Sequence, residues 1–266
     1  MSSTLGTLRE RAVPFWPGLL GVAGVLLLIV LWTIAAAVVP GRALPSPAAI
    51  LQAAVDDGWG FYWTNLGATF GRMLPGYLIG TTIALAIAAL VLLVPALDQV
   101  ANQVGVVADS LPITAIGPLV MIMFGGATAA TFLAALLVFY TTLVTALLGV
   151  HAAKRSSLEL VRAYGGGRLT RLRKVQVMAA LPSVFNALKL AVPAAFIGAL
   201  VGEYLGGIDV GIGVALQAAQ RDIMPARTFA LSLVVGLLSL AGYLLIGWIG
   251  RAVLPWSAET TLGARR

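Results

Sequence analysis

The sequence contains no cysteine, and His151 is its single histidine among 266 residues. Disulfide frameworks, thiol nucleophiles and thiolate metal sites are therefore excluded, and so is a metal cluster built from several histidines. Charged residues are scarce too: they form 10% of the chain, against about 25% in soluble domains. A chain that is 60% hydrophobic, with a mean hydropathy of +0.98, cannot cover itself with polar surface, so its expected solvent is a bilayer.

Long apolar runs dominate the rest of the sequence. A membrane-spanning helix needs about 20 mostly apolar residues, and six segments meet that pattern. We therefore predict an all-α integral membrane protein with six transmembrane helices in a single domain, residues 1–266. The first run is too long for a signal peptide and no cleavage motif follows it. The expected spans are 16–39, 73–94, 100–124, 127–150, 184–205 and 228–249.

The segment between the first two expected spans is rich in proline and aromatic residues. This composition predicts a loop followed by a short amphipathic helix that lies at the membrane interface. Its aromatic residues suit the level of the lipid headgroups. They are Trp59, Phe61, Tyr62 and Trp63.

The distribution of basic residues sets the expected orientation. Six spans place both termini and residues 151–183 on one side, which carries twelve Lys and Arg residues. The other side carries four, and Lys189 lies within the fifth expected span, where snorkelling is its expected behaviour. The excess of positive charge predicts that both termini and residues 151–183 face the cytoplasm, in a multi-pass protein of the cell membrane. The four are Arg42, Arg72, Arg221 and Arg227.

The basic loop 151–183 is interrupted by three consecutive glycines, residues 165–167. We predict a helix that Ser156 or Ser157 caps, with Glu159 in its first turn, and that the glycines end. A second basic helix is expected to end or kink at Pro182. Contact with anionic lipid would explain the charge alone, whereas a compact projection for a partner's groove would also explain the helix–turn–helix order. That order favours the projection.

The loop resembles the "EAA" loop of ABC-importer permeases. Glu159 is followed six residues later by Gly165, and a basic helix then ends in Ala-Leu-Pro at residues 180–182. The resemblance has two departures: Leu160 and Val161 replace the two alanines, and the Leu-Pro expected near residues 177–178 is missing.

Three further segments are similar to the nitrate, sulfonate and taurine subgroup of that family. They are LPSPAAILQA at residues 44–53, SLPITAIGPLVMIMFG at 110–125, and LVGEYLGG at 200–207 followed by GIG at 211–213. Together with the loop, these resemblances extend over residues 16–255, which is nearly the whole chain.

The resemblance implies a permease subunit whose coupling helix, in the loop between spans four and five, docks on a cytoplasmic ATPase. Two ATPase subunits would hold ATP and magnesium, a second copy or a homologous permease would complete the pathway, and an extracytoplasmic binding protein would deliver a small, anionic solute. Membrane lipid is a further expected partner, while nucleic acid and a cofactor bound by this chain are not expected. The residues expected at the ATPase are Glu159, Arg162, Tyr164, Gly165, Gly166 and Arg168.

Polar residues and prolines inside the spans indicate the translocation pathway. A charged side chain within a span costs about 3 kcal/mol and marks a candidate functional site, and a proline-broken helix is tolerated where backbone lines a cavity. Alternatives remain for three residues: Asp109 could cap the following segment, Met121 could serve packing, and Glu203 could bond to backbone or to an outer-loop arginine. The pathway candidates are Asp109, Ser110, Pro112, Thr114, Met121, Asn186 and Glu203.

Two other classes of protein fit the sequence less well. A secondary transporter driven by an ion gradient would be expected to show inverted repeats and paired acids at mid-membrane, which we do not find. A membrane-embedded enzyme lacks a catalytic set here, and the three glycines are not followed by the Gly-Lys-Ser/Thr of a phosphate-binding loop. ATP hydrolysis is therefore expected in a separate subunit.

Overall fold

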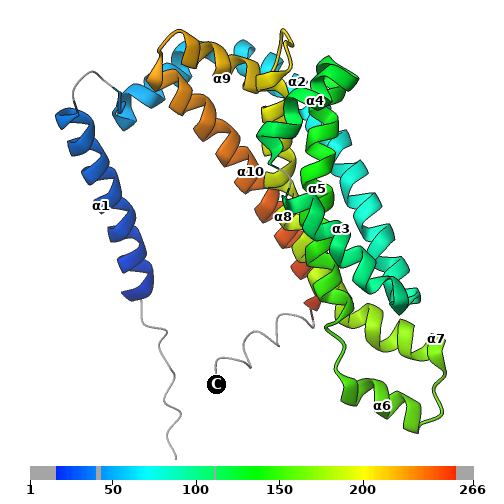
Figure 1. The fold of residues 1–266 in the computed structure, drawn as a ribbon. Helices are drawn as coiled ribbons and strands as arrows, with labels where there is room; N and C mark the ends of the chain where they lie inside the picture. Colours follow the sequence, from blue (N-terminus) through cyan, green and yellow to red (C-terminus); the bar gives the residue numbers. More distant parts are fainter. Residues whose placement is uncertain (1–15, 40–42, 111, 256–266) are drawn as a thin grey trace, which may run out of the picture.

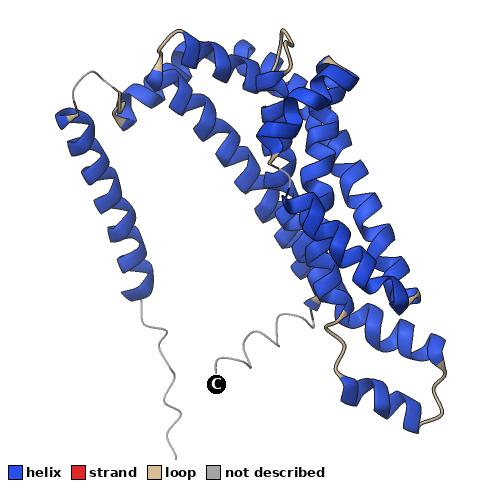
Figure 2. Ribbon diagram, in the orientation of Figure 1, coloured by secondary structure: helices blue, strands red, loops and turns tan. Residues whose placement is uncertain are grey.

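A computed structural model of the chain describes residues 16–39, 43–110 and 112–255. All regular elements in these ranges are helical (Figures 1 and 2), which confirms the all-α fold. The long helices are α1 (Trp16–Val38), α2 (Pro47–Leu93), α5 (Gly126–Val150), α8 (Val177–Leu205) and α10 (Pro225–Val253). The short ones are the 3-10 helix η2 (Pro95–Leu97), α3 (Asp98–Ser110), α4 (Ile113–Phe124), α6 (Arg155–Ala163), α7 (Arg168–Arg171), the π-helix η3 (Leu172–Gln176) and α9 (Ile212–Arg221).

Five of the described helices are long and apolar enough to cross a membrane. The pair formed by residues 95–108 and 113–124 is bent by 90° and makes a sixth if it counts as one span. The chain is therefore a multi-pass membrane protein. We call the end of the bundle that carries α6 and α7 the hairpin end, and the end that carries α9 the loop end (Figure 1).

The centre of the bundle is the pair α5 and α8, with α2 packed against both. Small residues let these helices approach closely, as is common where helices meet in membranes. A Cβ atom added at Gly198 of α8 would lie 2.5 Å from the Cα of Ala134 on α5. Leu133 and Phe196 fill the space around this crossing and are almost fully buried. The crossing therefore depends on glycine at that position.

Helix α2 starts earlier than the predicted span 73–94. Ser46 caps it by accepting a hydrogen bond from the Ala49 N–H at 3.2 Å, and Pro47 occupies the first turn. At Gly58 the backbone turns out of helical conformation, with φ 71°. The short interfacial helix is thus residues 47–57, and the spanning part already begins beside Trp59. Tyr62, expected at the interface, is 8% exposed and part of the core.

Helix α8 also differs from its expected span, 184–205. It continues without interruption from α7 and η3, so that one helical rod covers residues 168–205. Pro182 and Pro193 both lie inside this rod. Pro182, where the second loop helix was expected to end or kink, does not end it. The helix continues through this residue to Leu205 and packs against α5.

Helix α1 stands beside the bundle rather than within it (Figure 1). Its described apolar side chains are almost all exposed, as suits a helix surrounded by lipid. Trp32 attaches it to its neighbours: the indole N–H donates to the carbonyl of Pro45 at 3.1 Å, and the ring lies 6.1 Å from that of Phe229.

Gly198→Val should destabilise the protein, because the added side chain would force α5 and α8 apart at their closest approach. Overpacking of this kind costs about 1–3 kcal/mol. Gly236→Val on α10 is the matched control, since a Cβ atom there meets nothing within 4 Å. Thermal unfolding of the two purified variants in detergent measures the difference. Equal midpoints would show that the crossing tolerates separation.

Candidate functional site

The expected break in the third span is present, and Pro112 forms the N-cap of α4. Pro118 lies inside helix α4, which continues past it. Ser110, Pro112 and Thr114 are exposed. The side chain of Asp109 lies outside the described part of the structure, so its pathway role stays a prediction.

The remaining pathway candidates are spread along the bundle. Met121 packs with Val120 and Leu133, and its methyl group lies against Gly206 at the loop end. Asn186 is exposed on α8, about 20 residues and therefore about 30 Å of helix from Gly206. The structure thus brings Met121 to the interior contact between α4 and α8, and it does not gather these residues into one compact site.

Glu203 is the most buried charged residue among the described residues, at 1% exposure. Its Oε1 lies 2.7 Å from Nη1 of Arg72 on α2. Its Oε2 accepts hydrogen bonds from the Thr69 hydroxyl at 3.0 Å and from the Gly213 N–H at 2.9 Å. Taking two charges out of water is costly unless both are paired and hydrogen-bonded, and this arrangement satisfies both conditions.

The same side chains hold the loop that joins α8 to α9. Arg72 donates to the carbonyl of Val210 at 2.8 Å, and the hydroxyl of Thr69 accepts from the Ile212 N–H at 2.9 Å. The side-chain oxygen of Asn65 accepts from the Gly211 N–H at 3.0 Å. The two helices and this loop therefore form one polar cluster, which we call the Glu203 cluster: Asn65, Thr69, Arg72, Glu203 and the backbone of residues 210–213.

Glu203 therefore makes the bonds to an arginine and to backbone that were expected as the alternative to a role in the pathway. No role for Asn65 or Thr69 was expected from the sequence, and Arg72 counted only toward the orientation. One signal was available: Asn65, Thr69 and Arg72 have the spacing i, i+4 and i+7, which places three polar residues on one face of a helix. Their partner 131 residues away carried no comparable signal.

The glycines of the basic loop end α6 in a Schellman motif. The Gly166 N–H donates to the Val161 carbonyl at 2.8 Å, and the Gly165 N–H donates to the Arg162 carbonyl at 3.0 Å. Gly165 has φ 77°, a left-handed conformation that favours glycine. The chain then turns at Gly167 into α7. We call the segment α6–turn–α7, residues 155–171, the coupling hairpin.

Two details of α6 differ from expectation. Its N-cap is Lys154, which makes no side-chain capping bond, so neither Ser156 nor Ser157 caps the helix. Glu159 lies in the second turn rather than the first, beyond the reach of the N-terminal dipole. The capping signal failed because the helix starts one residue before the first serine.

The expected ATPase-contact residues divide into two groups. Glu159, Arg162 and Tyr164 are exposed, with Tyr164 at 86%, and none of the three side chains bonds to another described residue. Arg168, in contrast, donates to the carbonyl of Leu93 at the end of α2. Arg168 therefore ties the coupling hairpin to the bundle, while the first three remain available to a partner.

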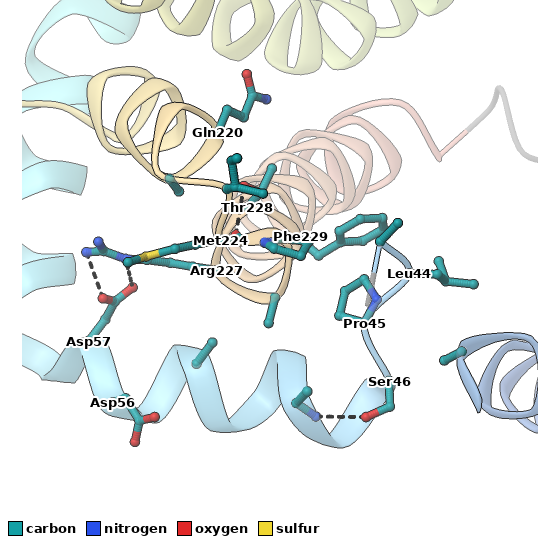
Figure 3. A pocket seen from close by; sticks show the side chains of 18 residues that line it. Leu44, Pro45, Ser46, Asp56, Asp57, Gln220, Met224, Arg227, Thr228 and Phe229 are labelled. Atoms are coloured by element: carbon teal, nitrogen blue, oxygen red, sulfur yellow. Dashed lines mark hydrogen bonds and ion pairs between the residues drawn. The ribbon is translucent and has the colours of Figure 1, made fainter. Parts of the chain in front are cut away.

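At the loop end, the interfacial helix meets α10 in a cavity of about 1200 Å³ (Figure 3). Arg227 of α10 makes a two-point ion pair with Asp57, at 2.8 and 3.1 Å. The guanidinium also lies 4.9 Å from the centre of the Phe61 ring. This pair therefore ties the interfacial helix to α10 directly before the Gly58 kink.

Comparison with known proteins agrees with these features. Residues 76–255 match the family of binding-protein-dependent transport system inner membrane components. The chain is 28% identical to the riboflavin transport system permease protein RibX of Chloroflexus aurantiacus over 92% of both chains. It is 26% identical to the formylaminopyrimidine transport permease protein ThiX of Halalkalibacterium halodurans, over 87% of this chain and 93% of the relative. The nitrate import permease protein NrtB of Leptolyngbya laminosa is 24% identical, over 74% and 70%.

The match covers more than half of the chain, and the chain belongs to this family of ABC-importer permeases. The predicted resemblance is confirmed, and an importer of small solutes is favoured over a transporter driven by an ion gradient. Membership implies in general that an ATPase and a binding protein work with the chain.

Replacing either member of the buried ion pair should be strongly destabilising, by about 3–5 kcal/mol, because the remaining charge stays buried without its partner. We expect Arg72→Gln and Glu203→Gln each to lower the unfolding midpoint, and the double variant to lose less than the sum of the two. The exposed Arg221→Gln is the control for loss of charge. Additive losses would mean that the two side chains are not coupled.

Proposed function

We propose that the coupling hairpin is the surface on which a cytoplasmic ATPase acts, and that the chain works as half of an importer's membrane domain. The observation that carries this proposal is the exposure of Glu159, Arg162 and Tyr164 on a helix whose exit angle is fixed by the Gly165–Gly166 turn. A rigid, exposed turn with unpaired polar side chains fits a cleft in a partner, whereas lipid contact needs no fixed angle.

The continuous rod 168–205 supports a mechanism for transmitting movement. Its first residue, Arg168, belongs to the coupling hairpin, and its last turn carries Glu203. A displacement of the hairpin by the ATPase would therefore act directly on the Glu203 cluster at the opposite end. We propose that this rod couples ATP-driven closure of two ATPase subunits, which hold ATP and magnesium, to opening of the pathway at the loop end.

We further propose that a second copy or a homologous permease completes the pathway. The exposed face around Pro112 and Thr114 would line this pathway. The other candidates would lie in or near the pathway: Asp109, Ser110, Met121 and Asn186. A binding protein would deliver the solute at the loop end. The three relatives described above are named for riboflavin, formylaminopyrimidine and nitrate. We propose that the solute of this chain is small and anionic. Solute-binding measurements on the cognate binding protein test both properties.

Gly165→Val should abolish co-purification of the ATPase and solute-stimulated ATP hydrolysis without lowering the amount of permease in the membrane. The reason is that valine is strained at φ 77°, so the two arms of the hairpin would meet at another angle. Gly167→Val is the matched control, because Gly167 has φ −71° and open space around it. Full ATPase association of Gly165→Val would contradict the proposal.

Glu159→Ala tests the contact itself. Since Glu159 lies in the second turn and bonds to no other described residue, its removal should leave the hairpin folded and weaken ATPase association by about tenfold, the effect of losing a charged hydrogen bond of about 1.5 kcal/mol. The affinity of the purified ATPase for permease in nanodiscs measures this, and an unchanged affinity would remove Glu159 from the contact.

The orientation has its own test. The chain has no cysteine. A single cysteine introduced at the exposed position Ser156 or Ala48 therefore shows on which side of the membrane that position lies. A membrane-impermeant thiol reagent applied to intact cells should label A48C and leave S156C unlabelled until the membrane is opened. Labelling of both from outside would place the two positions on the same side of the membrane and contradict the six-span topology.

A further inference from the structure

A groove of about 580 Å³ separates the hairpin end of α2 from the coupling hairpin. Its walls are leucines from both sides, and Arg168 and Arg171, which lie three residues apart on α7, also line it. No acidic residue lines the groove. In the described part of the chain neither arginine has a carboxylate partner. The leucines are Leu92, Leu93, Leu158, Leu169 and Leu172.

Arg171 is only partly satisfied. Its Nε is buried, and among the described residues it has no hydrogen-bond partner. A buried polar group without a partner is uncommon, and an acceptor bound in the groove would complete it. A guanidinium offers a planar fork of N–H donors that matches the oxygens of a phosphate. The chemistry of the groove is therefore that of a phosphate site with an apolar floor.

The depth of the groove in the membrane identifies the source of that phosphate. Trp59 and Trp63 are exposed, at 78% and 71%, and their rings lie 6.2 Å apart just beyond the Gly58 kink, a position typical of the membrane interface. From Trp63 to Leu93 the helix rises by about 45 Å. A bilayer including its headgroups is about 40–45 Å thick. Leu93, and the groove beside it, therefore lie at the headgroup level of the opposite leaflet.

We propose that this groove binds an anionic phospholipid of the leaflet at the hairpin end, with the phosphate between Arg168 and Arg171 and the start of an acyl chain along Leu93 and Leu172. Arg168 also holds the end of α2, so the bound headgroup would brace the coupling hairpin against the bundle. Basic pockets between helices on the cytoplasmic side are suited to anionic headgroups. The site is separate from the exposed face of α6 that carries Glu159 and Tyr164.

Native mass spectrometry of the purified full-length chain in detergent tests the proposal, with phosphatidylglycerol and phosphatidylcholine of identical acyl chains as probes. We expect the wild type to retain phosphatidylglycerol about tenfold more tightly than phosphatidylcholine, which corresponds to one charged hydrogen bond or more. Arg171→Gln should lose that preference. Arg173→Gln removes the same charge from an exposed position that does not line the groove and should keep the preference within about twofold.

Four results would overturn the proposal. Equal retention of the two lipids by the wild type would show a purely apolar groove, and equal losses in Arg171→Gln and Arg173→Gln would show diffuse attraction to positive charge. Competition by inorganic phosphate as effective as that by the lipid would indicate a soluble anion. Displacement of the lipid by purified ATPase would assign the groove to the ATPase interface. If Arg171→Gln does not elute as a single species, Arg171→Lys, which keeps the charge and loses the planar fork, replaces it.

Discussion

The ion pair between Arg72 and Glu203 is the constraint on which the loop end of this permease depends. A carboxylate at 1% exposure inside a membrane protein is stable only if donors of the protein replace the hydrogen bonds that it loses from water. Arg72, Thr69 and the Gly213 N–H supply those donors. In doing so they join α2 to the end of α8 and to the loop before α9, so the position of one charge determines how α2 meets a segment 131 residues away in the chain.

The glycine-rich composition of that loop follows from the same constraint. A Cβ atom at Gly211 would lie 2.5 Å from Oε2 of Glu203, and one at Gly213 would lie 2.6 Å from the carbonyl of Leu200. Side chains at either position would push the loop away from the carboxylate and uncouple the cluster. The loop is thus shaped by the need to bring backbone N–H groups close to a buried charge.

The hairpin end is built on the opposite principle. Its charges are exposed and largely unpaired, and its geometry comes from backbone: the Schellman motif at Gly165 and Gly166, and the helical rod that begins at Arg168. One end of the molecule is therefore fixed by side-chain chemistry, and the other presents side chains on a fixed backbone. The rod 168–205 links the two, because Arg168 of the coupling hairpin and Glu203 of the cluster lie on one continuous helix.

The sequence by itself determined what depends on local composition. Apolar runs indicated the helices, Pro112 indicated the break before α4, and Gly165 indicated the turn of the hairpin. Each of these features depends on the backbone conformation of the residue itself or on the preference of its side chain for lipid, and not on a distant partner. Only the tertiary structure decided the rest. Pro182 lies within a helix that packs against α5, Arg168 bonds to α2, and Glu203 finds a partner 131 residues away. Those outcomes depend on which segments pack side by side, and that arrangement leaves no periodic signal in the chain.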